Sequence, residues 1–175
     1  AADPRPRFGE AYRLPVIFIV QNNMYAISVP PEKQMAVPSA ADKACGLGLD
    51  GVQVDGSNVF KVYETMSRAV EKARKGLGPT LVETRMYRIT PHSSDDDDRS
   101  YRSREEVEEN KKRDPLLVAR TILEEAGLLS PEALAEMEAR AKAMVEDAVQ
   151  YATAAPYPKA EDAAFPVYVE DIRHD

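Results

Sequence analysis

Two stretches of the sequence carry side chains that could do chemistry. Asn22 and Asn23 directly follow an unbroken apolar run at residues 16–20. Oxygen atoms of amides and backbone carbonyls are the ligands that hard cations prefer, and asparagine side chains also fix turns by bonding to nearby backbone. On the residues alone, the pair indicates either part of a cation site or simply the polar end of a strand.

The second stretch is polar and carries His92. The imidazole of a histidine can donate or accept a proton near neutral pH, and the chain has one other histidine, His174. Four consecutive aspartates at residues 95–98 repel one another and need cations, hydrogen bonds or water. Arg88, Arg99 and Arg102 flank them and could tie the loop down. The pattern fits a proton-transfer site, and it equally fits a solvated acidic loop with an incidental histidine.

A parallel α/β sheet would bring both stretches to one edge. The run at 16–20 does not alternate, which predicts a strand covered on both faces. Residues 52–54 and 80–89 also have strand character, and between them an apolar stripe at helical spacing predicts a helix from Val59 to Lys75, capped by Ser57 or Asn58. Such a strand–helix–strand unit places its strands parallel, and ligands bind past their carboxyl ends.

One motif is misleading. Residues 46–51 match G-x-G-x-x-G letter by letter. A dinucleotide fingerprint must leave a strand and open a helix. Here the motif follows a predicted short helix that Ser39 caps and that runs to Ala44, and it enters a strand. We therefore reject this motif as a dinucleotide fingerprint.

Helices dominate the rest of the chain. The sequence predicts a charged helix at 104–112, a helix from Pro115 to Gly127 and a long amphipathic helix that begins at Ser130-Pro131. The apolar patch at 165–169 predicts a tail that docks on a neighbouring surface. The expected organisation is an irregular leader (1–13), an α/β domain with a helical extension (14–153) and a docking tail (154–175).

Composition excludes several classes of protein. The 175 residues carry a net charge of −7 with no basic face, which argues against nucleic-acid binding. There is no apolar run long enough for a membrane span and no signal-peptide pattern. The lone Cys45 excludes an internal disulfide framework and fits a reducing compartment. We expect a cytoplasmic protein, or a mitochondrial-matrix protein in a eukaryote.

Two motifs carry a family resemblance. The first is Asn-Asn-Met-Tyr-Ala-Ile-Ser at residues 22–28, and the second is Tyr-Arg-Ile-Thr-Pro-His-Ser-Ser at 87–94, followed by acids and Tyr-Arg at 101–102. Together they resemble the alpha subunit of the thiamine-diphosphate-dependent 2-oxoacid dehydrogenase decarboxylating component. Pyruvate-type relatives usually have threonine after the histidine, so Ser93 favours the branched-chain type. Met24 stands where relatives often have glycine.

The resemblance implies a fold and a set of site residues. The Gly-Asp-Gly that opens the family's cofactor motif is absent, so the chain resembles the C-terminal half: a partial three-layer parallel sheet with flanking helices, plus C-terminal helices. The Asn23 side chain and the Tyr25 carbonyl would ligate Mg²⁺, His92 would be catalytic, and Ser93 matches a position that animal relatives phosphorylate. The implied cofactor-binding residues are Asn22, Asn23, Tyr25, Ile27, Arg88 and His92.

The resemblance also implies partners and a reaction. A beta subunit completes an alpha2beta2 heterotetramer around thiamine diphosphate and supplies the glutamate that activates the cofactor. The reaction is decarboxylation of a 2-oxoacid, with acyl transfer to a lipoyl-bearing acyltransferase core. Without Gly-Asp-Gly, the chain alone is expected to bind the cofactor weakly or not at all. The alternatives are a non-catalytic assembly module of that complex and a pyruvate- or acetoin-type relative.

Overall fold

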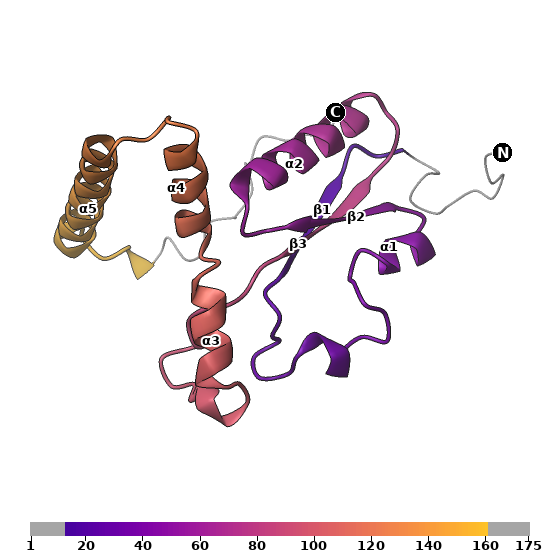
Figure 1. The fold of residues 1–175 in the computed structure, drawn as a ribbon, viewed down its shortest axis with the longest axis horizontal. Helices are drawn as coiled ribbons and strands as arrows, with labels where there is room; N and C mark the ends of the chain where they lie inside the picture. Colours follow the sequence, from indigo (N-terminus) through magenta and orange to yellow (C-terminus); the bar gives the residue numbers. More distant parts are fainter. Residues whose placement is uncertain (1–12, 161–175) are drawn as a thin grey trace. The chain divides into compact units, whose positions relative to one another are not determined.

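A three-stranded parallel sheet organises the N-terminal part of the chain. The computed structural model describes residues 13–160. Its contacts divide the chain into two compact units, Ala1–Leu128 and Leu129–Asp175, and the sheet lies in the first. The strands are β1 (Ile17–Asn22), β2 (Asp50–Asp55) and β3 (Thr80–Arg85), in the order β1-β3-β2 (Figure 1). The predicted parallel α/β sheet is confirmed.

The strand register brings the predicted chemical residues to one edge. Arg85 at the end of β3 pairs with Asn22 on one side and with Asp55 on the other. Because all three strands run in the same direction, the segments that follow them leave from the same edge of the sheet. The segments after Asn22 and after Arg85 leave neighbouring strands, as the sequence predicted.

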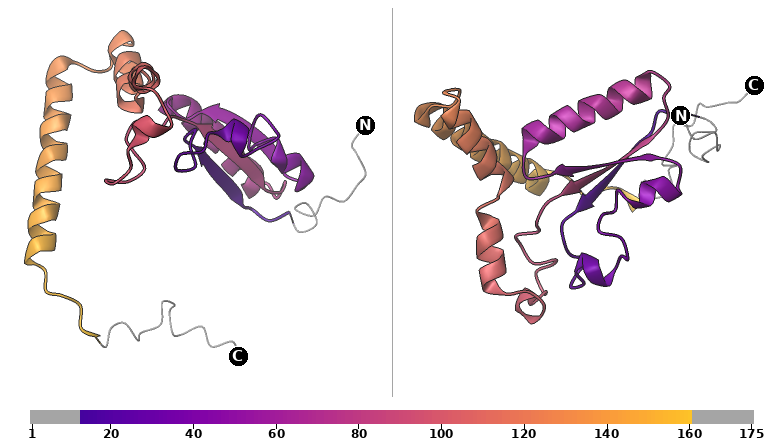
Figure 2. Two further views of the ribbon diagram at one scale, coloured as in Figure 1. Left: turned by 90° about the horizontal axis from the view of Figure 1, so that it is seen from below. Right: turned by 45° about the vertical axis from the view of Figure 1, so that its right-hand side comes forward.

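Helices lie on both faces of this sheet. α2 (Val59–Arg74) lies on one face and the short α1 (Lys43–Gly46) on the other (Figures 1 and 2). Neighbouring β3 residues alternate between the two layers, as side chains of a strand must. Leu81 packs with Ala41 and Ala44, whereas Val82 packs with Val54 and Ala69. The three-layer arrangement is therefore confirmed.

Three predictions about elements need correction. Phe18 and Ile19 in β1 are 48% and 53% exposed, so the run at 16–20 is not covered on both faces; within residues 13–160, β1 is an outer strand. The predicted strand 80–89 stops at Arg85, because its partner β1 turns away after Asn22. α1 begins at Lys43 rather than after Ser39, whose hydroxyl instead bonds to Glu83.

The glycine motif connects α1 to β2, and no helix follows it, which confirms that it is not a dinucleotide fingerprint. Its last glycine has a packing role. A Cβ atom on Gly51 would lie 2.2 Å from the Ala41 carbonyl oxygen and 3.0 Å from the Ala44 Cβ atom. The backbone before α1 can approach β2 this closely only because residue 51 has no side chain.

Gly51→Ala is therefore expected to lower the free energy of unfolding by at least about 1–3 kcal/mol, the usual cost of overpacking, because the clash is with backbone. Gly46→Ala is the matched control, since nothing lies within 4 Å of a Cβ atom at that position. Denaturant unfolding of both variants measures the difference. Equal stability of the two variants would contradict the close approach.

The remaining helices begin where the sequence predicts them. α3 (Arg104–Lys111), α4 (Pro115–Glu125) and α5 (Pro131–Ala154) begin after Ser103, Asp114 and Ser130, and each of these side chains accepts a hydrogen bond from a backbone N–H of the first turn. Two 3₁₀ helices, η1 (Pro31–Lys33) and η2 (Asp98–Ser100), complete the elements of the described residues.

α5 belongs to the second unit, and its apolar side chains are largely exposed, including Met144 at 67% and Val145 at 64%. Within the described residues, no helix combines the length and apolarity that a membrane crossing requires. The predicted docking patch at 165–169 lies outside the described residues. The predicted leader and tail boundaries stay predictions.

Candidate functional site

The segment after β1, residues 22–28, is here called the asparagine loop. Two successive side-chain-to-backbone turns open it. Asn22 Oδ1 accepts a hydrogen bond from the Met24 N–H at 3.2 Å, and Asn23 Oδ1 accepts one from the Tyr25 N–H at 3.1 Å. Met24 has a φ of 69°, in the left-handed region that favours glycine. The two asparagines therefore hold the backbone in a conformation that it would not otherwise favour.

The asparagine loop contains a second strained residue. Ile27 has a φ of 56° in a tight turn that the paired N–H and C=O groups of Ala26 and Val29 close at 2.9 and 3.0 Å. A β-branched residue rarely adopts this conformation, which costs of order 1–3 kcal/mol and tends to occur at ligand sites. The Ile27 side chain is 57% exposed, so internal packing does not explain the strain.

Arg88 joins the asparagine loop to the segment after β3. Its Nη2 atom donates to the Ile27 carbonyl at 2.6 Å and to the Tyr101 hydroxyl at 2.9 Å, and its Nη1 atom lies 3.4 Å from the Tyr25 carbonyl. The Arg88 N–H also donates to the Asn23 carbonyl at 3.2 Å. In the described part of the chain, the buried Nε atom of Arg88 has no hydrogen-bond partner.

Residues 90–102, here called the histidine loop, connect to the same arginine. Asp96 Oδ2 accepts hydrogen bonds from the Tyr101 hydroxyl at 2.5 Å and from the His92 N–H at 2.9 Å. The Tyr101 hydroxyl in turn accepts from Arg88. A continuous chain of hydrogen bonds thus runs from the backbone of exposed His92 to the asparagine loop, and both predicted loops lie at one edge of the sheet.

The acidic run is held by specific partners rather than by solvent alone. Asp97 accepts from Arg99 Nε at 2.6 Å, and Asp98 pairs with Arg102 at 2.6 Å. Hydrogen bonding to Arg99 lowers the pKa of Asp97, and hydrogen bonds from Tyr101 and the His92 N–H lower the pKa of Asp96. The interpretation as a merely solvated acidic loop is therefore wrong for Asp96 and Asp98, whereas the Asp97–Arg99 pair is exposed to solvent.

Arg102 lies at the centre of a group of tyrosines. Its side chain is fully buried, and its guanidinium carbon lies 5.7, 5.4 and 5.9 Å from the ring centres of Tyr25, Tyr87 and Tyr101. It also donates to the carbonyls of Arg88 and Ile89. Cation–π contacts of this kind are strongest when desolvated. Arg102 therefore fixes the start of the histidine loop against the asparagine loop.

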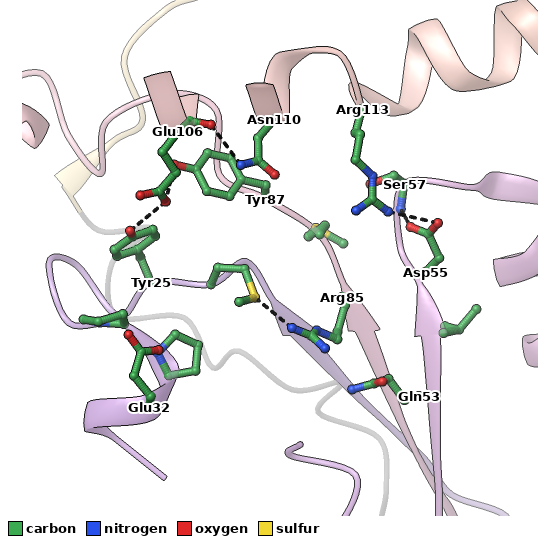
Figure 3. A pocket seen from close by; sticks show the side chains of 15 residues that line it. Tyr25, Glu32, Gln53, Asp55, Ser57, Arg85, Tyr87, Glu106, Asn110 and Arg113 are labelled. Atoms are coloured by element: carbon green, nitrogen blue, oxygen red, sulfur yellow. Dashed lines mark hydrogen bonds and ion pairs between the residues drawn. The ribbon is translucent and has the colours of Figure 1, made fainter. Parts of the chain in front are cut away.

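Glu106 in α3 ties two of these tyrosines together. Its Oε1 atom accepts the hydroxyl hydrogens of Tyr25 at 2.8 Å and Tyr87 at 2.9 Å (Figure 3). The Ser103 hydroxyl accepts the Glu106 N–H at 3.0 Å at the start of the helix. Serine followed three residues later by glutamate is a capping pattern that marks a helix start. Here the Glu106 side chain accepts hydrogen bonds from the Tyr25 and Tyr87 hydroxyls instead of from the backbone at the start of α3.

The tyrosine hydroxyls in this group hold their protons tightly. Burial, reinforced by the Glu106 carboxylate, raises the pKa of Tyr25 and of Tyr87, and burial and Asp96 raise the pKa of Tyr101. An unfolded tyrosine ionises near pH 10. A raised folded pKa contributes stability that is fully present below about pH 10 and is lost as the pH rises through the folded pKa.

Alkaline titration is therefore expected to show Tyr25, Tyr87 and Tyr101, three of the eight tyrosines, ionising late and together with unfolding. Ultraviolet absorbance of tyrosinate measures this. Glu106→Gln removes one carboxylate and should advance the ionisation of Tyr25 and Tyr87, with Tyr101 as the internal control because it binds Asp96. A single early step for all eight tyrosines would contradict the prediction.

A cavity of about 640 Å³ lies beside this group, at the ends of β2 and β3. One wall is made by Tyr25, Tyr87 and Glu106, and another by Asp55, which pairs with Arg113 at 3.2 Å (Figure 3). Arg85 projects between them. Among the predicted site residues, Tyr25 lines this cavity.

The asparagine loop offers oxygen atoms to a cation. In residues 13–160, no group of three or more histidine, cysteine, aspartate or glutamate side chains is arranged to hold a metal ion. Asn23 Oδ1 and the Tyr25 carbonyl belong to one turn, and each accepts one hydrogen bond, from the Tyr25 N–H and from Arg88. Such oxygens have two lone pairs, so both can still ligate a hard cation.

Comparison with known proteins identifies the family. A family model described as "Dehydrogenase E1 component" matches residues 7–161, which is most of the chain. The chain belongs to this family. The resemblance that the asparagine and histidine loops predicted is thereby confirmed for this E1 chain.

Two relatives are from Bacillus subtilis (strain 168). The 2-oxoisovalerate dehydrogenase subunit alpha is 51% identical over 163 residues, covering 93% of this chain and 49% of the relative. The pyruvate dehydrogenase E1 component subunit alpha is 44% identical over 156 residues, covering 89% and 42%. The E1 chain therefore spans about half the length of these curated relatives.

A third relative is the 3-methyl-2-oxobutanoate dehydrogenase subunit alpha of Mycobacterium tuberculosis (strain CDC 1551 / Oshkosh). It is 44% identical over 135 residues, covering 77% of this chain and 37% of the relative. The identity is 51% to the 2-oxoisovalerate dehydrogenase subunit alpha and 44% to the pyruvate dehydrogenase subunit alpha. The higher identity to the subunit named for a branched 2-oxoacid supports the predicted branched-chain type.

Sequence reasoning missed several residues of the site. The flanking arginines, Arg102 among them, were expected to tie the acidic loop down, but the burial of Arg102 among tyrosines was not predicted. Glu106 was predicted only as part of a charged helix. The capping pattern of Ser103 and Glu106 was visible in the sequence, but it predicts a helix start and not a partner for two tyrosines. The buried Glu83 in β3 gave no signal, since it stands alone between apolar and hydroxyl residues.

Proposed function

We propose that this E1 chain is part of the alpha subunit of a branched-chain-type 2-oxoacid dehydrogenase, which decarboxylates a 2-oxoacid on thiamine diphosphate and transfers the acyl group to lipoyl. The observation that carries the proposal is the joining of the asparagine loop and the histidine loop at one sheet edge. Arg88 contacts the first loop at Ile27 and the second at Tyr101.

Within this proposal the asparagine loop holds Mg²⁺. Asn23 Oδ1 and the Tyr25 carbonyl would be two of its oxygen ligands, and further oxygen atoms from the cofactor, water or other residues would complete the site. Asn22 shapes the loop, Arg88 orders it, and exposed Ile27 supports the cofactor. Thiamine diphosphate, when bound, supplies the electron sink that decarboxylation requires.

His92 is the proton-transfer residue of the proposal. Its backbone is held by Asp96, and its side chain is exposed at the edge of the sheet where ligands of α/β proteins bind. It can hold or deliver a proton while the acyl group passes to lipoyl. The proposed partners are a beta subunit, in an alpha2beta2 heterotetramer, and the lipoyl-bearing acyltransferase core. The proposed location is the cytoplasm, or the mitochondrial matrix of a eukaryote.

Ser93 lies next to His92 in the exposed histidine loop. A phosphate on Ser93 would meet the neighbouring carboxylates, and like charges repel, so phosphorylation would loosen the loop. We therefore include regulation by phosphorylation of Ser93 in the proposal. It would require a kinase as a further partner.

Calorimetric titration with thiamine diphosphate and Mg²⁺ tests the proposal. The chain alone supplies two of the metal's ligands, so it is expected to bind weakly or not at all, whereas the full-length alpha subunit assembled with its beta subunit should bind tightly. Absence of binding by the assembled complex would refute the proposed function. Tight binding by the chain alone would refute the division of the site between chains.

A second candidate function is that of a non-catalytic assembly module. The half-exposed Phe18 and Ile19 on the outer strand β1 favour it, because a further element could cover them. Mass measurement of the chain with and without a beta subunit distinguishes this candidate, since a persistent monomer would eliminate it. Substrate assays of the complete complex separate branched-chain from pyruvate- or acetoin-type activity.

A further inference from the structure

Glu83 is a fully buried carboxylate in the middle of the central strand. It lies in β3, faces the same layer as Leu81, and has no exposed surface. An isolated buried carboxylate is costly unless it is hydrogen-bonded. Burial raises the pKa of Glu83, but hydrogen bonds from four donors outweigh burial and lower it.

The two oxygen atoms of Glu83 have different partners. Oε2 accepts from the Ser39 hydroxyl, from the Ala41 N–H at 3.1 Å and, at 3.4 Å, from Gln53 Nε2. Oε1 accepts from Asn22 Nδ2 at 2.6 Å. One oxygen therefore holds the core segments together, and the other contacts the first residue of the asparagine loop.

The contact through Oε1 decides which way the Asn22 amide faces. With its NH₂ group donating to Glu83, the Asn22 oxygen must point away, and there it accepts the Met24 N–H at 3.2 Å. Rotating the amide would place two donors against each other at Met24. This bond holds Met24 in the left-handed region, and Met24 lies between Asn23 and Tyr25 in the turn that their hydrogen bond closes.

We propose that Glu83 is a positioning residue for the cation ligands: its Oε1 atom orients the Asn22 amide, and Asn22 thereby fixes the turn that holds Asn23 Oδ1 and the Tyr25 carbonyl. The inference rests on the proposed function. It differs from a general role in stability, because the oxygen that acts on the loop is not the oxygen that binds Ser39, Ala41 and Gln53.

Glu83→Gln separates the two roles. The new amide oxygen can face the donors at Ser39, Ala41 and Gln53, which leaves its NH₂ group against the NH₂ group of Asn22. Asn22 must then rotate, and the Met24 N–H loses its acceptor. Adding Asn22→Asp reverses donor and acceptor: the NH₂ group introduced at position 83 donates to the carboxylate introduced at position 22, and this carboxylate still accepts the Met24 N–H. Net charge is unchanged in the double variant.

The measurements use the full-length alpha subunit assembled with its beta subunit. The first is the hydrogen-exchange rate of the Met24 and Tyr25 amides, and the second is the Mg²⁺ concentration needed for half-maximal thiamine diphosphate binding by calorimetry. For Glu83→Gln we expect faster exchange and a roughly tenfold higher Mg²⁺ requirement, as for other residues that orient metal ligands. The double variant should restore both to within about twofold.

Ser39→Ala is the matched control, because, of the two Glu83 oxygens, it affects Oε2 alone. It also removes the Ser39 Oγ atom that accepts the Ala41 N–H at 3.0 Å. It should lower the melting temperature while leaving the Mg²⁺ requirement within about twofold of wild type. The inference would be overturned if the Mg²⁺ requirement rose equally in Ser39→Ala and Glu83→Gln. It would also be overturned if the Mg²⁺ requirement of Glu83→Gln were that of wild type. If Glu83→Gln does not assemble, the Asn22→Asp variant is compared with the double variant that also carries Glu83→Gln. If adding Glu83→Gln does not improve Mg²⁺ binding, the inference is overturned.

The wild-type complex separates this inference from the proposed function. If wild type binds thiamine diphosphate with Mg²⁺ and Glu83→Gln binds equally well, the inference alone fails. If wild type does not bind the cofactor at any Mg²⁺ concentration, the proposed function fails, and the inference fails with it.

Discussion

Arg102→Ala is expected to lower the free energy of unfolding by about 3–5 kcal/mol, the usual cost of breaking a buried ion pair from one side. The Arg102 side chain is fully buried, and the Asp98 side chain is only 12% exposed, so the variant leaves a carboxylate without compensation. The change also removes the donor to the Arg88 carbonyl and the cation among three tyrosine rings. Denaturant unfolding followed by circular dichroism measures the loss.

Arg99→Ala is the matched control for this variant. Arg99 also pairs with an aspartate of the histidine loop, Asp97, but both side chains are more than half exposed. Water and salt screen such a pair, so little change in stability is expected. If the two alanine variants were equally stable, Arg102 would not be the residue that fixes the histidine loop.

Under the proposed function, His92→Ala in the assembled complex is expected to slow acyl transfer to lipoyl by roughly 10²–10⁴-fold, the usual contribution of a positioned proton-transfer group. The His92 side chain is exposed, so the variant should fold as wild type does. Rates of lipoyl acylation, together with calorimetric cofactor binding, separate a chemical defect from a binding defect.

Ser94→Ala provides the comparison for His92→Ala, since Ser94 is an exposed residue of the same loop. It should change the rate of acylation by less than about twofold, within the spread expected of a surface substitution. A His92→Ala rate as high as that of Ser94→Ala would show that His92 takes no part in proton transfer.

The sheet and its edge could be predicted from the sequence because they depend on local patterns. The apolar run before Asn22, the helix stripe after Asn58 and the turn before Thr80 each fix an element, and a strand–helix–strand unit fixes the direction of its strands. Element ends were less predictable. β3 stops at Arg85 because β1 turns away, and no residue of β3 itself records where its partner ends.

The chemistry of the site was predictable only in part. Asn23, Arg88 and His92 could be identified because they stand in motifs, and the positive φ at Met24 explains why relatives often have glycine there. Glu83 and Glu106 could not, since their partners lie far away in the chain: Glu83 meets Asn22, and Glu106 meets Tyr25. Pairings across such distances depend on tertiary packing rather than on sequence spacing.

Cofactor titration of an Asn23→Ala complex tests the central claim most directly, because Asn23 Oδ1 is the proposed side-chain ligand from this chain. Loss of a metal ligand should weaken thiamine diphosphate binding at limiting Mg²⁺ by at least about tenfold, with partial recovery at high Mg²⁺. Unchanged binding by Asn23→Ala at every Mg²⁺ concentration would contradict the assignment of the asparagine loop as the cation site.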